Sequence, residues 1–508
     1  MYEIEIKLAV PPDQRDRVVA RLRRSATQRT RLQAVYFDTP DHRLADALIA
    51  LRLRKEGRRW MQTAKAAGDN PAQRLEHNAP RQGAAGAPPR LPDPALHQGT
   101  PVGKRLAQAL GEPVSRATLR AQYSADIWRT QRLLKAGSAR LELAFDEGTI
   151  AAGALGGKGA SVAVCELEIE CIGGPSLAVL DVAEQWIERH GLWLDWRSKA
   201  LRGERLARPA LERADAPARL RADPEMTVAR AWLELNRACM PTVFEAASDV
   251  AAGSAGAADI HRLRIALTRL RMVWRLFRGT PFAPPAALEQ YVHQLFRALG
   301  RVRDLQVCAR LVQEQCATRP TPWVAQWLEQ ESALHAQADP SAWLRDSGLN
   351  RAWLSWLRLC WDEPGAAALA DAGERFGPWM GRQLGQWHRR ALKRAARFGQ
   401  ADDARRHELR KGLKRFRYAL EMLTPLLPAK ALDRLVRRVR RCEKSLGRLN
   451  DLSVCRQLVE RSREPGAPPW LLARLAAEHA RTLGRCLDDL DRLARTPTAA
   501  LWAALKAR

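Results

Sequence analysis

The chain has 508 residues, with 84 Lys and Arg against 56 Asp and Glu, which gives a formal net charge of +28 at pH 7. With 46 % hydrophobic residues it is too apolar to be wholly disordered, and the length predicts roughly two to four domains. No run of about 18 apolar residues occurs, and the N-terminus MYEIEIKLAV lacks the apolar stretch of a signal peptide. We therefore expect a cytoplasmic protein that does not span a membrane. Its positive charge implies a polyanionic partner, and composition alone does not choose among nucleic acid, anionic lipid and a phosphate polymer.

Two common kinds of site are absent from the sequence. The nine cysteines are scattered and never spaced C-x-x-C, so we expect reduced packing residues and neither disulfides nor zinc ligands. No G-x-x-x-x-G-K-[ST] loop is present, which argues against a Walker-type nucleotide hydrolase.

The sequence changes character along its length. Residues 1–205 hold short segments of alternating polarity separated by Gly/Pro-rich stretches, a pattern typical of strands and turns. Residues 206–224, rich in Pro, Ala and charge, are predicted to form a linker. From 225 to 508 apolar residues recur at spacings of three and four, which predicts long helices.

The helical part contains an internal repeat. HRLRIALTRLRMVWRLF from His261 aligns with HELRKGLKRFRYALEML from His407. Downstream, LGRVRDLQVCARLV from Leu299 aligns with LGRLNDLSVCRQLV from Leu446. We expect two copies of one multi-helix unit, at about 225–365 and 370–508, which form two helical bundles.

Charged and aliphatic residues alternate in five N-terminal segments: YEIEIKLA, ALRLRKE, QRLEHN, ARLELAFDEG and CELEIEC. On a strand, this period of two places the charges on one face and the aliphatic side chains on the other. A single strand of this kind is usually a solvated face over a core. Five such strands are better explained by a closed antiparallel barrel, with charges in its lumen and aliphatic side chains packed outward under helices.

A lumen of mixed charge has a definite chemistry. Carboxylates on facing strands supply the hard oxygen ligands that Mg²⁺ or Mn²⁺ prefers. Arg and Lys supply hydrogen-bond donors that match phosphate oxygens. The sequence therefore predicts a site for a metal-chelated polyphosphate, with metal-assisted attack by water as the expected reaction.

Eight motifs of residues 1–205, in order, resemble the CYTH domain, the triphosphate tunnel metalloenzyme fold with an eight-stranded antiparallel tunnel. They are E-x-E-x-K at Glu3, Glu5 and Lys7, YFDT at 36–39, LRLR at 51–54, TAK ending at Lys65, R-x-E at Arg74 and Glu76, LAFDEG at 143–148, ELEIE at 166–170 and SKALRG at 198–203. The resemblance implies a divalent metal held by Glu3, Glu5, Glu168 and Glu170, with Glu166 and Asp146 as further candidates. It also implies triphosphate binding by Lys7, Arg52, Arg54, Lys65, Arg74, Glu76, Arg129 and Lys199.

The repeated helices carry basic stripes. His261, Arg264, Thr268, Arg271 and Arg275 follow spacings of 3, 4, 3 and 4, and the second copy gives His407, Arg410, Lys414 and Arg417. A lone basic helix is usually a solvated face, but here the stripe recurs with a His at the same start. Acidic partners four residues away are almost absent, so we expect these charges to need an external counter-ion.

The second part resembles the CHAD domain, an α-helical domain often found after CYTH, on both His-x-x-Arg helices and both LG-x-x-x-D segments. That family is built as two antiparallel helical bundles about a pseudo-twofold axis, with a basic groove that binds inorganic polyphosphate. The resemblance implies anion binding by His261, Arg264, Arg271, Arg303, His407, Arg410, Lys414 and Arg417.

The sequence thus predicts an N-terminal α+β domain with an antiparallel β-barrel and an all-α C-terminal domain of two pseudo-symmetric bundles. The expected function is metal-dependent hydrolysis of inorganic triphosphate, with Mg²⁺ or Mn²⁺, by a protein that also binds inorganic polyphosphate and associates with polyphosphate granules. The alternative is a polyphosphate-associated scaffold whose tunnel has weak activity or acts on thiamine triphosphate or a nucleotide. Nucleic-acid binding is disfavoured, because no base-reading module is recognised and few aromatic residues flank the basic stripes.

Overall fold

The computed structural model describes residues 2–506 except 69–72, 82–88, 112, 115–116, 154, 158, 209–222, 224, 254–255, 318, 320, 336–338, 362–372, 423, 425–426 and 463–465. The chain divides into two compact units. The first contains Met1–Ala214 together with Ala247–Asp249 and Leu344–Trp361, and the second contains the rest. Most of the predicted linker at 206–224 lies outside the described residues.

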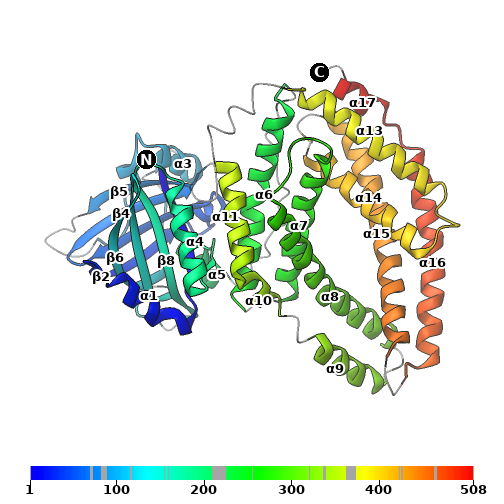
Figure 1. Cartoon of the computed structure of the whole chain (residues 1–508), viewed down its shortest axis with the longest axis horizontal. Helices are drawn as coiled ribbons and strands as arrows, with labels where there is room; N and C mark the ends of the chain where they lie inside the picture. The colour runs from blue at the N-terminus through cyan, green and yellow to red at the C-terminus, as the bar shows by residue number, and fades with distance from the viewer. Residues whose placement is uncertain are drawn as a thin grey trace. The chain divides into compact units, whose positions relative to one another are not determined.

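A nine-stranded antiparallel sheet forms the first unit (Figure 1), in the order β5-β4-β3-β2-β6-β7-β8-β1-β9. Its strands are β1 (Tyr2–Ala9), β2 (Gln28–Asp38), β3 (Ile49–Glu56), β4 (Arg59–Ala67), β5 (Gln73–Arg81), β6 (Arg120–Ala136), β7 (Ala139–Ala152), β8 (Ser161–Gly173) and β9 (Trp193–Leu194). Strand β1 also pairs with β5, from Tyr2↔Leu75 to Ile4↔Gln73. This pairing links β1 to the far edge of the sheet over three residue pairs. The predicted antiparallel, tunnel-like sheet is therefore confirmed, but over the described residues it has nine strands in place of the expected eight and is not a fully closed barrel.

The aliphatic face of the strands points outward and is covered by helices. These are α1 (Arg15–Leu22), α2 (Arg43–Asp46), α3 (Pro101–Leu110) and α4 (Ala178–His190), with short 3₁₀ turns at Pro12–Gln14 and Pro94–His97. Leu51 of β3 and Ala64 of β4 are fully buried in one cluster with Val102 and Leu106 of α3. The alternation read from the sequence therefore separates an aliphatic outer core from a charged lumen.

Helix α5 (Lys199–Ala207) packs on the inner face of the sheet. Tyr36 of β2 is paired with Arg52 of β3 and with Tyr123 of β6, so all three side chains share that face. The two tyrosine rings stack at 4.6 Å, and Ala200 and Leu206 of α5 pack against their cluster. One part of the lumen is thus filled by apolar contacts with α5.

Helix α11 (Ser347–Trp361) belongs to the first unit, although the sequence pattern placed it with the helical repeats. It packs on α4 through ion pairs from Arg351 to Glu184 (2.9 Å) and Glu188 (3.0 Å). The Asn350 side chain accepts a hydrogen bond from the Leu194 backbone N–H at 2.9 Å. An amphipathic period predicts such a helix but not the surface on which it packs.

The second unit is helical, as predicted. Its helices are α6 (Val228–Ala251), α7 (Ala257–Leu276), α8 (Ala286–Cys316), α9 (Trp323–His335), α10 (Pro340–Arg345), α13 (Phe376–Ala395), α14 (Asp403–Met422), α15 (Ala429–Glu460), α16 (Pro469–Ala494) and α17 (Ala499–Lys506). Residues 247–249 of α6 and the last two residues of α10 belong to the first unit. Helices α7 and α14 each have 20 residues, and α8 and α15 have 31 and 32, which matches the repeat in the sequence. Within the described ranges, none of the helices combines the length and apolar character needed to cross a bilayer.

Candidate functional site

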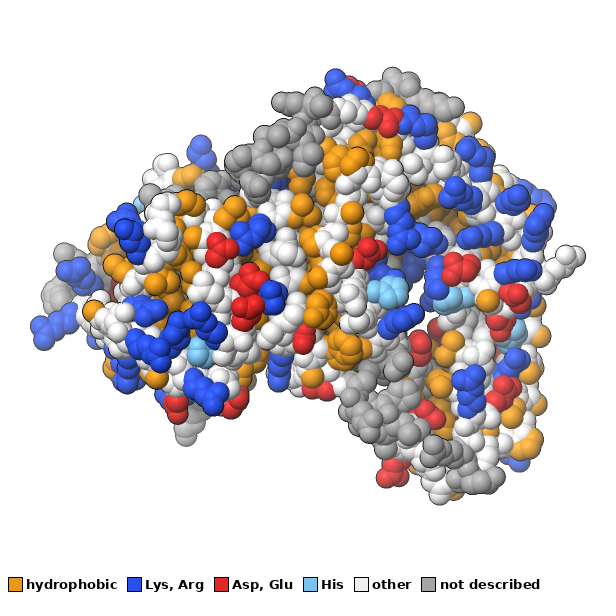
Figure 2. Space-filling model, viewed as in Figure 1, with side chains coloured by type: hydrophobic (Ala, Val, Ile, Leu, Met, Phe, Trp, Pro, Cys, Tyr) orange, Lys and Arg blue, Asp and Glu red, His pale blue; other side chains and the backbone are white. Residues whose placement is uncertain are grey.

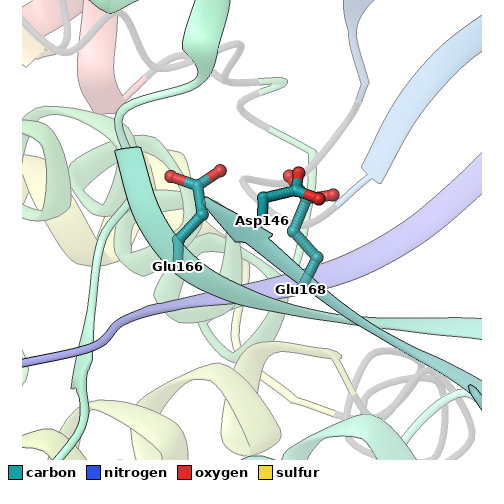
Figure 3. Close-up of side chains that lie close together, drawn as sticks. All are labelled: Asp146, Glu166 and Glu168. Atoms are coloured by element: carbon teal, nitrogen blue, oxygen red, sulfur yellow. The ribbon is translucent and has the colours of Figure 1, made fainter. Parts of the chain in front are cut away.

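Three carboxylates from neighbouring strands meet on the inner face of the sheet (Figure 3). Asp146 of β7 is in register with Glu166 of β8, and Glu168 is the next inward-facing residue of β8. One oxygen atom of each lies within 4.8 Å of the others. Asp146 and Glu166 are 0 % and 1 % exposed. This carboxylate trio is a set of hard oxygen donors of the kind that binds divalent cations.

Cationic side chains neutralise the carboxylate trio. The Lys199 Nζ atom, at the start of α5, lies 2.6 Å from Asp146 Oδ2, 2.5 Å from Glu166 Oε1 and 2.8 Å from Glu168 Oε1. Arg129 of β6 binds Asp146 through two hydrogen bonds of 2.7 and 2.6 Å and also pairs with Glu168. Burial alone would raise the pKa of Glu168, but Lys199 and Arg129 hold that pKa well below its usual value. Burial also acts to raise the pKa of Asp146, and Arg129 and Lys199 lower it below its usual value, so both carboxylates are held in the charged form.

A second acidic set continues along β8. Glu170 is in register with Glu5 of β1 on one side and with Glu142 of β7 on the other. Burial raises the pKa of Glu170 to about 7, and although Lys65 lowers it, the negative charges of Glu5 and Glu142 raise it further. This part of the lumen holds an excess of negative charge that a bound cation would relieve.

The remaining predicted phosphate ligands lie on β1 and on strands β3 to β5. Arg52 donates a hydrogen bond of 3.1 Å to the Tyr36 hydroxyl. Arg54 pairs with Glu56, and burial lowers the pKa of Arg54 to about 10, with the charge of Arg52 lowering it further. These guanidinium groups crowd one another, as expected for a surface that receives an anion.

Lys65 pairs with Glu76 at 2.5 Å, and Lys7 Nζ donates to the Arg197 carbonyl oxygen at 2.7 Å. Burial lowers the pKa of Lys7. Arg74 faces Glu3 in the β1–β5 pairing, but the Glu3 side chain lies outside the described residues.

Three inner-face residues were not among the predicted ligands. Arg202 of α5 pairs with Glu166, Glu142 adjoins Glu170, and Tyr36 holds Arg52. Arg202 stands in the SKALRG motif and Tyr36 in YFDT, so both motifs carried the signal. Asp38 of YFDT has a structural part: its buried carboxylate accepts backbone hydrogen bonds from Thr39 (2.7 Å) and from Leu44 and Ala45 (both 2.9 Å).

Basic side chains from both repeats come together on the helical unit, where Figure 2 shows Lys and Arg gathered. Arg264 of α7 and Arg410 of α14 lie at equivalent repeat positions, and Lys414 lies one turn after Arg410. The Nη1 atom of Arg264 is buried without a hydrogen-bond partner among the described residues. Burial lowers the pKa of Lys414 to about 8, and the charges of Arg410 and Arg264 lower it further. We call Arg264, Arg410 and Lys414 the basic cluster.

The glycines of the two LG-x-x-x-D segments, Gly300 and Gly447, lie next to arginines of the basic cluster. A Cβ atom added at Gly300 of α8 would lie 3.1 Å from Arg264 Nη1, and one at Gly447 of α15 would lie 4.0 Å from Arg410 Nε. Glycine at position 300 therefore lets the Arg264 guanidinium group lie close to α8, whereas a Cβ atom at position 447 would make only an ordinary van der Waals contact with Arg410.

The other predicted anion ligands differ in their surroundings. Arg271 lies over the Phe296 ring at 4.3 Å, with Phe296 also below Arg264. Arg417 is instead paired with Glu421 at 2.8 Å and with Glu443 at 2.9 Å. The expectation that the charges of this stripe need an external counter-ion is therefore wrong at this position. Arg303 is close enough to lower the pKa of Arg264 further, while burial has the larger effect.

The two histidines are not equivalent. His261 is exposed, whereas His407 Nδ1 lies 2.6 Å from Asn450 Oδ1. Burial and the charge of Lys411 lower the pKa of His407, which disfavours the protonated form of this ring.

Comparison with known families assigns both units. The CYTH domain family matches residues 1–203, and the CHAD domain family matches residues 235–460. The chain is a CYTH domain followed by a CHAD domain.

Individual relatives are more distant. An inorganic triphosphatase from Haemophilus influenzae is 28 % identical over 210 residues, which cover 40 % of this chain and 54 % of that protein. The chain thus spans about half the length of this curated relative. Among solved structures, a putative adenylyl cyclase from Hippeastrum with a dominant triphosphatase activity shows 17 % identity and a TM-score of 0.30, covering 41 % of this chain and 97 % of its own. The CHAD domain from Ricinus communis shows 25 % identity and a TM-score of 0.39, covering 58 % and 98 %.

Gly203 controls how α5 sits in the CYTH tunnel. A Cβ atom at this position would lie 2.0 Å from Tyr123 Cδ2, so Gly203→Ala should displace α5 together with Lys199 and Arg202. We expect a loss of roughly 1–3 kcal/mol in the free energy of unfolding, with reduced activity at the carboxylate trio. Gly484→Ala in α16, where a Cβ atom meets nothing within 4 Å, is the matched control and should leave both unchanged or raise stability. Denaturant titration and phosphate release measure the two effects, and an unchanged Gly203→Ala variant would contradict this packing.

Proposed function

We propose that the CYTH domain hydrolyses inorganic triphosphate with Mg²⁺ or Mn²⁺, and that the CHAD domain binds inorganic polyphosphate. The observation that carries the first part is the carboxylate trio of Asp146, Glu166 and Glu168, held on the inner face of the sheet among Lys and Arg. Family membership and the relative named as an inorganic triphosphatase support the same reaction.

The residues fit a divalent cation by their chemistry. The carboxylate trio consists of oxygen donors only, and a cationic Nζ atom already lies among them. Glu5 and Glu170 add oxygen donors where negative charge is in excess. We infer that the metal is held by these five residues, with Glu3 as a further ligand. When bound, it would polarise a phosphate oxygen and lower the pKa of a bound water molecule.

The cations of the lumen would bind and orient the substrate. The strand order places β3 and β4, which carry Arg52, Arg54 and Lys65, on the side of the tunnel away from β7 and β8. A triphosphate would lie between this cationic side and the carboxylate side, with Arg129 and Lys199 next to the carboxylates. Arg and Lys donors in a partly buried site stabilise the charge that develops on phosphate oxygens during cleavage.

A substrate panel tests the reaction. The full chain should release phosphate from inorganic triphosphate faster than from ATP, thiamine triphosphate or long-chain polyphosphate, all at saturating Mg²⁺. A kcat/KM for ATP or thiamine triphosphate higher than that for inorganic triphosphate would contradict the proposed substrate. Release no faster than that of the Glu168→Gln variant for every substrate would favour the scaffold alternative.

For the CHAD domain, the buried Nη1 atom of Arg264 and the crowded Lys414 support anion binding. An anion would accept a hydrogen bond from that Nη1 atom and would offset the charges of Arg410 and Arg264 that lower the pKa of Lys414. Localisation in the cytoplasm, association with polyphosphate granules and the domain boundaries at 205 and 225 stay predictions.

Lys414 gives polyphosphate binding a pH dependence. With its pKa at about 8, the side chain is charged below that pH and loses its proton as pH rises through it. Affinity for long-chain polyphosphate should therefore fall between pH 7 and 9. Lys414→Arg keeps the charge in this range and should flatten the dependence, which isothermal titration at both pH values would show. An equal pH dependence in both proteins would contradict the assignment.

A further inference from the structure

The two helical repeats meet at a pair of cysteines. Cys308 of α8 and Cys455 of α15 stand at equivalent places in the repeated segments QVCARLV and SVCRQLV. Their Sγ atoms are 2.8 Å apart, and each Sγ lies 3.8 Å from the carbonyl oxygen of the other cysteine. Both side chains are buried, at 1 % and 0 % exposure, in a cluster with Leu311 and Leu452.

This geometry is close to that of a disulfide. The sulfur atoms need to approach by less than about 1 Å to reach the disulfide bond length of about 2.05 Å. Helices α8 and α15 pack directly on each other, so the approach requires no change of partner. All nine cysteines of the chain are free in this structure, which is the reduced state.

We propose that Cys308 and Cys455 are an oxidative cross-linking site, at which a hydroperoxide joins the two CHAD repeats by a disulfide bond. The sulfur of the first thiol attacks the terminal oxygen of the peroxide and becomes a sulfenic acid. The O–O bond breaks, and the remaining oxygen takes up the thiol proton and leaves as water from hydrogen peroxide or as an alcohol from an organic hydroperoxide. The second thiol attacks that sulfur, forms the S–S bond and releases one water molecule. Two thiols are oxidised, one peroxide is reduced, and a dithiol returns the protein to the free state.

The surroundings of the two cysteines determine how fast they are oxidised and how much the bond stabilises the fold. The neighbouring Cys455 thiol and burial raise the pKa of Cys308, so the thiolate is scarce and oxidation is slow. The bond links residues separated by 147 positions, and cross-links across long segments remove more entropy from the unfolded chain. The oxidised CHAD domain should therefore unfold at a temperature higher by on the order of 5–10 °C.

The test uses the full chain, incubated with hydrogen peroxide or with dithiothreitol. Free thiols are alkylated after denaturation, and proteolytic peptides are analysed by mass spectrometry. We expect a peptide pair joined through Cys308 and Cys455, two fewer alkylated thiols, and a raised melting temperature that dithiothreitol reverses. Alkylation of both cysteines after peroxide treatment, or a joined pair without a melting shift, would overturn the proposal.

Variants separate this bond from general oxidation. Cys308→Ser and Cys455→Ala should each lose the peroxide-dependent melting shift, measured against the same variant in its reduced form. Cys239→Ser, at a buried cysteine of α6, is the matched control and should retain the shift. Loss of the shift in the control, or its persistence in both site variants, would assign the effect to other residues.

Discussion

Glu168→Gln should lower the rate of inorganic triphosphate hydrolysis by on the order of 10²-fold or more. The substitution keeps the size of the side chain but removes the charge that Lys199 and Arg129 bind and that the metal requires. Glu168 belongs to the carboxylate trio and has an exposed side-chain fraction of 15 %, so no core cavity is created. Steady-state phosphate release at saturating Mg²⁺ measures the effect, and thermal melting monitors the fold. Glu5→Gln should act in the same direction, because Glu5 lies beside Glu170.

A carboxylate one residue from Asp146 provides the matched control. Glu147 points to the outer face of β7 and pairs there with Arg15 of α1 at 2.5 Å. Glu147→Gln removes one negative charge from the same strand without touching the lumen, so activity should stay within about twofold of the parent. Full activity in Glu168→Gln, or equal losses of activity in both variants, would contradict the assignment of the metal site to the carboxylate trio.

The double variant Arg264→Ala/Arg410→Ala should weaken binding of long-chain polyphosphate by about tenfold or more while leaving triphosphate hydrolysis unchanged. Each substitution removes one guanidinium group of the basic cluster, one from each repeat. A charge-assisted hydrogen bond contributes about 1.5–3 kcal/mol, which corresponds to at least tenfold in affinity. The salt dependence should also flatten, because fewer counter-ions are released from the polyanion.

A control double variant at two exposed arginines tests whether the loss of positive charge alone explains the weaker binding. Arg437 of α15 and Arg492 of α16 are exposed, and Arg437→Ala/Arg492→Ala removes the same net charge. This control should change affinity by less than about threefold at 0.15 M salt. Equal losses of affinity in both double variants would show that α7 and α14 bind polyphosphate only as part of a general basic surface. Intact helical content by circular dichroism distinguishes lost binding from lost folding.

The charged lumen was predictable because strand periodicity is a local property. Residues at 166, 168 and 170 alternate with aliphatic neighbours, and pairing of β8 with β7 brings Asp146 beside them. The partner of these carboxylates was harder to locate. Lys199 lies on a helix some thirty residues further along the chain, and only the folding of α5 onto the inner face brings its Nζ atom to the trio. The SKALRG motif marked the lysine, but no spacing rule gives this contact.

The basic stripes show what helical periodicity does not predict. Helical spacing placed Arg410, Lys414 and Arg417 on one face, but Arg417 is neutralised by Glu443 of another helix as well as by Glu421. Periodicity along one helix says nothing about charges that arrive from a packed neighbour. For the same reason the sequence could not show that α11 packs on α4, or that Cys308 and Cys455 meet. These contacts depend on tertiary packing between segments far apart in the chain.

The central claim is tested most directly by phosphate release from inorganic triphosphate, measured on the purified full chain in Mg²⁺ and again after chelation. The account predicts steady release with Mg²⁺, loss of at least two orders of magnitude after chelation, and recovery when Mg²⁺ or Mn²⁺ is restored. Undiminished release after complete chelation would contradict a metal-dependent reaction at Asp146, Glu166 and Glu168.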